Sequence, residues 1–460
     1  MSTSPDSTPA PARTTAPPAA GTAETALRQT LLSRGYLRLL LLSALLGVPV
    51  ALACFFFVAL QHELQHWVWT SLPEALGHPA PPWWWPLPAL LLAGLIVAPV
   101  VTRLPGRGGH LPVNGLGGPP VGPAALPGVV LAALLTLPLG VVLGPEAPLM
   151  AVGSGLALLA LRLRKGTDDP QAAAVVANTG STAAISTILG GPVVAAVLVV
   201  EAAGVGGARL VALLLPCLTA SATGALVFTG FGSWTGLSIG ALTLPSSALP
   251  RVGPDAGDFL WGLPLAALIA VVITLARRLG RRAAAWNGSA HGAPAAWRVV
   301  ACAVAVGVCV AAYALVTGRS PAEAALSGQA TLAQLAGRPH AWPVAALLAL
   351  VLFKGLAWGI SLGSLRGGPI FPSVLLGASA GIACSGLPGL GITPALALGI
   401  AAAATAVTGL PLTSSVLAVL LLGRAAYDQT PLIVLAAVVS VVVTQALGRT
   451  TGNGSGAHRP

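Results

Sequence analysis

The chain has 460 residues, of which 55% are hydrophobic and 8% are charged. Because about a quarter of the residues in a soluble domain are charged, this composition excludes a soluble globular protein and predicts an all-α polytopic protein of the cell membrane. The net charge of +11 gathers in clusters at predicted helix ends, at 162–165, 277–278 and 281–282. These clusters place their loops in the cytoplasm and argue against nucleic-acid binding, since no soluble region presents a basic face.

The five cysteines lack metal-binding spacing, and we expect neither a metal nor a cofactor.

The two ends of the chain are polar. Residues 1–34 are rich in Ser, Thr, Pro and Ala, which predicts a disordered N-terminal tail. Arg28, Arg34 and Arg38 precede or open the first long apolar stretch, at about 39–60, and therefore place the N-terminus in the cytoplasm. A short polar tail at 451–460 ends the chain, and we expect it in the cytoplasm as well. The predicted transmembrane domain covers residues 35–450.

The first span ends in a short polar motif, His-Glu-Leu-Gln-His at 62–66. On a helix His62 and His66 share a face and could bind zinc, with Glu63 as a general base. Trp67 and Trp69 follow directly and are typical of the aromatic belt at a membrane surface. No third ligand is evident in the sequence. We favour an interfacial polar helix end, and an intramembrane zinc protease is the alternative from another functional class.

A Gly/Pro-rich stretch follows the second predicted span, which covers about 83–101. It begins with Gly-Gly-His-Leu-Pro at 108–112, where the glycines let backbone N–H groups approach an ion. The lone His110 is more often a satisfied polar group than a ligand. A short apolar helix at 128–143 is predicted to lead into a glutamate, Glu146.

Glu146 lies in the frame Gly-Pro-x-x-Pro-x-x-x-x-Gly at 144–153, and the same frame recurs 224 residues later at 368–377. Proline is tolerated in the first turn of a helix, so each frame predicts a helix that begins inside the membrane. Two such starts in corresponding places indicate a midplane binding site, and their free N–H groups attract anions. An intramembrane glutamate is a functional candidate by default; the alternative is a structurally paired cap.

A second pair of helix breaks supports an internal duplication. Pro192 and Pro411 each follow a glycine-containing break and lie 219 residues apart, which predicts repeat halves at about 36–230 and 255–450. Glu201 is a candidate inner carboxylate, or equally a structural cap. Lys354 and Arg366 flank the second frame and either raise the local positive potential or extend to the interface. A polar loop is predicted at 283–297, and further spans at about 171–188, 208–229, 259–276, 299–316, 341–360, 373–385, 394–408, 412–422 and 431–447.

These motifs together resemble those of the CLC family of chloride channels and proton-coupled chloride exchangers. Residues 144–148 resemble the family's G-R-E-G-P motif, 108–112 its G-S-G-I-P motif and 368–372 its G-x-F-x-P motif. The resemblance implies a family member of the bacterial type, without cytoplasmic regulatory domains. Its expected fold is an inverted repeat of tilted helices, assembled as a homodimer, and Glu146 is its expected gating glutamate. It implies an anion site formed by Gly108, Gly109, His110, Gly144, Pro145, Ala147, Gly368, Ile370 and Phe371.

The departures from the family pattern limit what the resemblance implies. The motif serine is Gly109 here, Pro369 replaces a backbone donor, and the late pore tyrosine has no counterpart. Ala202 stands where exchangers carry a proton-relaying glutamate. The expected function is therefore passive or loosely proton-coupled transport of a small anion through a pathway of helix N-termini in the lipid bilayer. Chloride is the anion that the resemblance favours. A proton-coupled exchanger is the alternative, and a relative that has lost transport is a third hypothesis.

Overall fold

A computed structural model describes residues 20–116, 120–163, 169–204, 206–236, 244–245, 249–250 and 252–452. The predicted tails at 1–19 and 453–460, and Arg164 and Lys165 of the predicted basic loop, lie outside these residues. The first half of the described chain forms nine α-helices: α1 (Ala20–Leu31), α2 (Arg34–His66), α3 (Leu72–Ala75), α4 (Pro86–Arg103), α5 (Leu126–Thr136), α6 (Glu146–Leu163), α7 (Pro170–Ile188), α8 (Pro192–Ala202) and α9 (Gly207–Thr235).

The second half of the described chain forms eight: α10 (Ala256–Gly288), α11 (Ala293–Thr317), α12 (Gln329–Gly337), α13 (Val344–Ser364), α14 (Ile370–Cys384), α15 (Ile392–Thr408), α16 (Pro411–Leu422) and α17 (Thr430–Gly452). Short 3₁₀ segments include Pro105–Gly108, Pro112–Asn114 and Pro321–Glu323. Eight helical segments of the described chain are long and apolar enough to cross a membrane. The prediction of an all-α, multi-pass membrane protein is confirmed.

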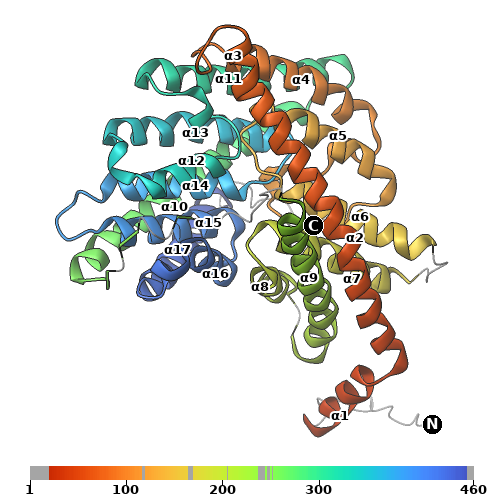
Figure 1. The fold of residues 1–460 in the computed structure, drawn as a ribbon. Coiled ribbons are helices and arrows are strands. Elements are labelled where there is room, and N and C mark those ends of the chain that lie inside the picture. Colours follow the sequence, from red (N-terminus) through yellow and green to blue (C-terminus); the bar gives the residue numbers. More distant parts are fainter. Residues whose placement is uncertain are drawn as a thin grey trace, which may run out of the picture.

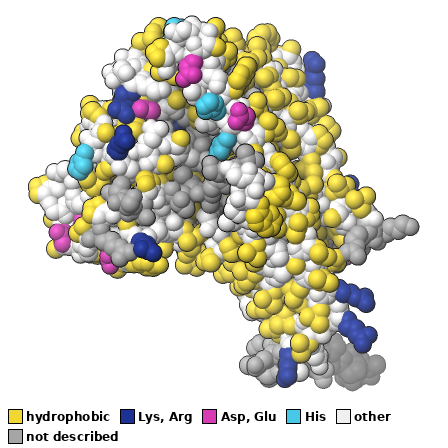
Figure 2. Space-filling view, in the orientation of Figure 1, with side chains coloured by type: hydrophobic (Ala, Val, Ile, Leu, Met, Phe, Trp, Pro, Cys, Tyr) yellow, Lys and Arg dark blue, Asp and Glu magenta, His cyan; other side chains and the backbone are white. Residues whose placement is uncertain are grey.

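The surface of the molecule agrees with this assignment. Figure 2 shows apolar side chains over most of one face, with Lys and Arg side chains at its lower end near α1. Helix α2 alone exposes Leu41, Leu45 and Phe56 by more than half of their area, at 62%, 59% and 55%. An apolar face of this kind is stable in contact with lipid rather than water.

The two halves repeat the same arrangement of helices. Helices α2 and α10 each have 33 residues, and the short helices α8 and α16 have 11 and 12. Helix α2 packs against α9 as α10 packs against α17, and α6 packs against α7 as α14 packs against α15. Figure 1 shows α14–α17 grouped on one side of the molecule and α6–α9 on the other. The predicted internal repeat is therefore present in the structure.

Glycine pairs hold the two equivalent helix pairs in close contact. A β-carbon on Gly153 of α6 would lie 2.2 Å from the carbonyl oxygen of Gly180 on α7, and the reverse distance is also 2.2 Å. In the second half, Gly377 of α14 and Gly399 of α15 stand in the same relation, at 2.1 and 2.3 Å. The equivalent glycines are 224 and 219 residues apart in the sequence, which are the spacings of the two motif pairs. Small residues at such crossings let helix backbones approach in a membrane.

Several boundaries differ from those predicted. Helix α1 covers residues 20–31 of the expected disordered tail. Helix α10 continues to Gly288, into the expected polar loop at 283–297, and the Asn287 side chain donates to the Ala283 carbonyl within that last turn. Helix α5 ends at Thr136, seven residues before its predicted end, because Pro138 follows and has no N–H to continue the helical hydrogen bonds.

Candidate functional site

The two Gly-Pro frames meet in the structure. The Gly144 N–H donates to the Gly368 carbonyl at 2.8 Å, and the Gly368 N–H donates to the Gly144 carbonyl at 2.5 Å, in an antiparallel bridge. Gly144 and Gly368 occupy equivalent positions of the two frames, so their reciprocal hydrogen bonds describe a local two-fold axis between the halves. This backbone pair, called the seam below, brings the starts of α6 and α14 together.

Glu146 is the first residue of α6 and extends across the seam to α14. Its side chain is fully buried, and Oε1 accepts a hydrogen bond from the Phe371 N–H at 2.8 Å. Oε2 is buried without a hydrogen-bond partner among the described residues, and no cationic side chain of the described chain forms an ion pair with Glu146. The carboxylate therefore occupies the N-terminus of α14, where the helix dipole and free amides attract a negative group.

Both seam glycines are required by the position of this carboxylate. A β-carbon on Gly144 would lie 2.1 Å from Glu146 Oε2, and one on Gly368 would lie 1.8 Å from the same atom. Neither glycine has a left-handed backbone, so their role is to leave space rather than to allow a turn. The notch between them holds the Glu146 side chain.

The remaining residues of the predicted anion site are divided between the seam and a neighbouring loop. Pro145, Ile370 and Phe371 are buried at the two helix starts, and Ala147 is half-buried in the first turn of α6. Gly108 and Gly109 have left-handed φ angles of 73° and 97°, whereas His110 is exposed.

The Gly108–Gly109 loop lies beside the link between α13 and α14. A β-carbon on Gly108 would lie 3.3 Å from Arg366 Cγ, and the Arg366 Nε–H donates to the Arg107 carbonyl at 2.9 Å. Arg366 stands two residues before Gly368 in the chain. The loop therefore approaches the seam through Arg366, and no hydrogen bond joins it to Glu146 among the described residues.

Glu201, near the end of α8, contacts the start of α16. Its Oε1 accepts from the Leu412 N–H at 2.8 Å, and its Oε2 accepts from the N–H and the hydroxyl of Thr413, each at 2.7 Å. The Glu201 carboxylate thus caps α16, as Glu146 occupies the start of α14. In both cases a carboxylate of the first half satisfies amides at the start of a helix in the second half. Of the two alternatives left open for Glu201, this contact is the one expected of a structural cap, and the role of Glu201 as an inner carboxylate stays a prediction.

Both cations that flank the second frame have buried side chains. Lys354 is fully buried, and its Nζ donates to the carbonyls of Ala324, Ala325 and Leu326 at 3.0, 2.8 and 3.2 Å. The charge of Lys354 is therefore used to hold the turn before α12. Arg366 is 6% exposed and donates to the carbonyl of Arg107, in the loop described above, and to that of the adjacent Leu365.

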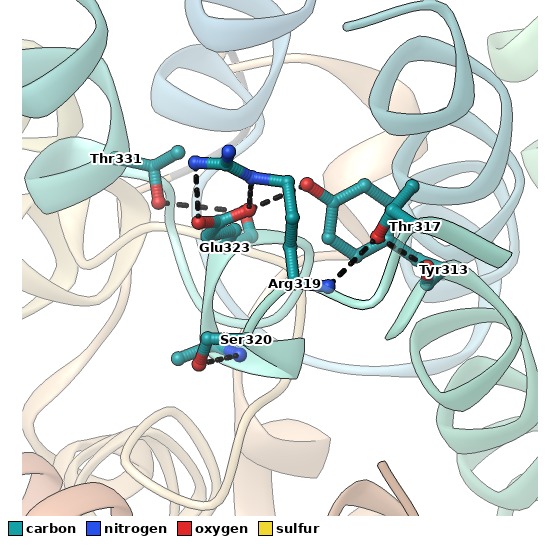
Figure 3. Close-up of polar contacts among 7 residues, drawn as sticks. Tyr313, Thr317, Arg319, Ser320, Glu323 and Thr331 are labelled. Carbon is teal, nitrogen blue, oxygen red and sulfur yellow. Dashed lines mark hydrogen bonds and ion pairs between the residues drawn. The ribbon is translucent and has the colours of Figure 1, made fainter. Parts of the chain in front are cut away.

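The His62–His66 motif has no third metal ligand among the described residues. His62 and His66 line a cavity of about 470 Å³ together with Glu323, a candidate for a third ligand. Figure 3 shows that the Glu323 carboxylate is already engaged, because Arg319 binds it through two nitrogens at 2.8 and 2.9 Å and the Tyr313 hydroxyl donates to it at 2.5 Å. The described residues contain no group of three His, Cys, Asp or Glu side chains that could hold a metal. The protease alternative is not supported.

The Arg319–Glu323 pair was not predicted from the sequence. The Glu323 carboxylate raises the pKa of the Arg319 guanidinium by hydrogen bonding, and Arg319 lies 3.9 Å from the centre of the Trp342 ring. The sequence does contain a signal for this ion pair. Arg319 and Glu323 have opposite charges and lie four residues apart in a short polar segment between two apolar spans.

Comparison with known proteins agrees with this geometry. A family model described as "Voltage gated chloride channel" matches residues 111–445. "Putative ion-transport protein YfeO" of Salmonella paratyphi A is 33% identical over 126 residues, which cover 27% of this chain and 31% of that protein. The Escherichia coli protein of the same name is 33% identical over 168 residues, covering 36% and 39%. The chain thus matches about a third of the length of these curated relatives.

Solved structures show the same fold at low sequence identity. A slow cyanobacterial Cl⁻/H⁺ antiporter has a TM-score of 0.74 and 17% identity, and a CLC-type fluoride/proton antiporter has 0.69 and 19%. Each comparison covers 89% of this chain and 95% of the other. The family model covers well over half of the chain, and the resemblance noted in its motifs is confirmed: this protein is a member of the CLC, or voltage-gated chloride channel, family.

Proposed function

We propose that this protein carries a small inorganic anion, chloride first, across the membrane, and that Glu146 gates the pathway. Family membership supports anion transport. The observation that carries the gating role is the hydrogen bond from the Phe371 N–H to Glu146 Oε1 at 2.8 Å. The carboxylate occupies a buried helix N-terminus that would otherwise offer a free amide to a passing anion.

The gate follows from competition for this amide. A deprotonated Glu146 is itself an anion and occupies the position that a chloride ion would take. Protonation removes the charge, the side chain leaves the notch between Gly144 and Gly368, and the Phe371 N–H becomes available to the ion. Helix N-termini carry partial charges, so the ion binds weakly enough to leave again.

We further propose that coupling to protons is loose or absent. Ala202 has no ionisable group, and the neighbouring Glu201 is committed to three hydrogen bonds at the start of α16. Both solved relatives named above are antiporters, so proton-coupled exchange is the alternative mechanism. The same proposal places the protein in the bilayer as a homodimer, with one pathway in each subunit and both termini in the cytoplasm.

The test is anion efflux from liposomes that contain the purified protein. Efflux of chloride, fluoride and nitrate is measured at acidic and neutral pH while external pH is recorded. We expect chloride efflux to rise at acidic pH, and Glu146→Gln to abolish that pH dependence. Glu74→Gln, which changes an exposed glutamate of α3, is the matched control.

Three results would contradict parts of the proposal. An unchanged pH response in Glu146→Gln would remove Glu146 from the gate. Uphill proton movement driven by a chloride gradient would establish exchange in place of loose coupling. Absence of efflux for every anion tested would indicate a family member that does not transport.

A further inference from the structure

A second candidate site lies in a cavity of about 600 Å³ whose lining includes Gly109 of the predicted anion site but no residue of the Glu146 notch. The cavity is bounded by the end of α4, the loop that follows it, the link between α10 and α11, and the end of α13. Its polar lining includes Arg107, Asn287, His291, Ser364 and Arg366. A water molecule takes up about 30 Å³ in the liquid, so the space far exceeds what one halide ion requires.

The lining of this cavity contains basic side chains and no acidic side chain that could neutralise them. It contains two arginines and a histidine, and no Asp or Glu is among the described residues that line it. Arg366 is 6% exposed, and its recorded hydrogen bonds go to the carbonyls of Arg107 and Leu365 at 2.9 and 3.2 Å. Carbonyl groups orient a guanidinium but do not neutralise it. A buried cation is costly without a counter-ion, and in the described part of the chain Arg366 has none.

Asn287 forms part of the wall of the same cavity. Its Nδ2 donates to the Ala283 carbonyl at 2.9 Å and to the Cys302 Sγ at 3.6 Å. Its Oδ1 is closed to solvent, so contact with an anion in the cavity rests on the two arginines. Phosphate oxygens match the planar donor fork of arginine.

The rim of the cavity has the composition of a membrane interface. Trp286 and Trp297, on either side of the link between α10 and α11, are 46% and 67% exposed. Arg298 lies 5.1 Å from the centre of the Trp286 ring, and Arg281 and Arg282 are exposed on the last turns of α10. Tryptophan and arginine in this arrangement are typical of the headgroup region, where basic pockets between helices bind anionic lipid headgroups.

We propose that this cavity binds a phosphate group, either free inorganic phosphate or the headgroup of an anionic phospholipid, through Arg107 and Arg366. The proposal does not depend on which anion crosses the membrane or on the role of Glu146. Inorganic phosphate and phosphatidylglycerol present the same group to the two arginines, and the experiment separates these sources.

The test uses the full-length protein purified in detergent. Thermal unfolding is measured against inorganic phosphate and, at matched ionic strength, against chloride, and native mass spectrometry records phosphatidylglycerol bound in nanodiscs. Arg107→Gln removes an exposed guanidinium, and Asn287→Asp places a negative charge in the cavity. Arg281→Gln, an exposed arginine of α10 that does not line the cavity, is the control. Arg366 is left unchanged because it is buried, and its substitution could misfold the protein. Loss of binding in the other two variants is therefore not caused by misfolding at Arg366.

We expect phosphate affinity or lipid retention to fall by about tenfold or more in Arg107→Gln, the effect of losing one hydrogen bond between charged groups. It should also fall in Asn287→Asp, because the added negative charge repels the phosphate, and should be unchanged in Arg281→Gln. Stabilisation by inorganic phosphate would identify the free ion as the source. Retention of phosphatidylglycerol without a phosphate effect would identify the lipid. Equal stabilisation by chloride and phosphate would overturn the proposal in favour of a plain anion vestibule, and equal behaviour of all three variants would overturn it altogether.

Discussion

The notch that holds Glu146 permits a test of the gate that leaves Glu146 itself unchanged. Gly144→Ala adds a methyl group 2.1 Å from Glu146 Oε2, 2.6 Å from Cδ and 2.7 Å from Oε1. Since ordinary contacts between heavy atoms are about 3.5–4.0 Å, the whole carboxylate must move by about 1 Å or more. The obstructed atoms are the far end of a flexible side chain, and the backbone of Gly144 suits alanine, so the fold should tolerate the change.

The displacement removes the hydrogen bond from the Phe371 N–H to Glu146 Oε1. A hydrogen bond to a charged group contributes about 1.5–3 kcal/mol, and each 1.36 kcal/mol corresponds to a tenfold change in an equilibrium. The closed position of Glu146 should therefore be disfavoured about 10- to 150-fold in Gly144→Ala. Anion efflux at neutral pH should rise towards its acidic value, and Gly368→Ala should have the same effect, because its methyl group would lie 1.8 Å from the same oxygen.

The assay is the liposome efflux measurement at acidic and neutral pH. Gly355→Ala is the control, since a β-carbon there meets no atom within 4 Å. In a Glu146→Ala background, Gly144→Ala should have no further effect, because the two changes act on the same side chain. Folded Gly144→Ala protein that keeps the wild-type ratio of acidic to neutral efflux would refute the gating role of this notch.

Three further predictions concern the surrounding structure, each measured as a thermal midpoint in detergent. Glu201→Ala removes the cap of α16 and should cost about 1–2 kcal/mol with no change in the pH profile of efflux; an altered profile would give Glu201 a part in proton movement. Gly377→Ala places a methyl group 2.1 Å from the Gly399 carbonyl oxygen and should destabilise the protein by about 1–3 kcal/mol, whereas Gly355→Ala should lower the midpoint far less. Lys354→Met leaves three buried carbonyls without their donor and should cost about 1–3 kcal/mol or more; an unchanged midpoint would contradict the structural role of this lysine.

The features of the fold that the sequence could predict depend on local signals. Proline restricts where a helix can begin, so the two frames at 144 and 368 located the starts of α6 and α14 within two residues. The nearly equal spacings of the two motif pairs, 224 and 219 residues, then predicted the repeat. Where polarity was the only signal the prediction was poorer, because the charged end of α10 resembles a loop although it continues as helix to Gly288.

Contacts between distant parts of the chain could not be predicted in the same way. Glu146 was identified as a candidate by its position in an apolar region, but its partner, the Phe371 N–H, is 225 residues away and carries no side-chain signal. The same holds for Glu201 and the amide of Leu412, 211 residues apart. Lys354 and Arg366 were noted as cations near the second frame, yet only the packing of the turn before α12 and of the Gly108–Gly109 loop distinguishes their roles.

One contact between the halves is made by main-chain atoms of Gly144 and Gly368, and it has a consequence for divergence within the family. Every residue except proline has both a main-chain amide and a carbonyl group, so substitutions elsewhere can accumulate without weakening that contact. The Glu146 carboxylate lies between these two residues and requires that neither of them has a side chain. A protein with this contact can retain its fold while sharing 17% of its residues with a relative. We expect amino-acid substitutions to be rarest at the two glycines.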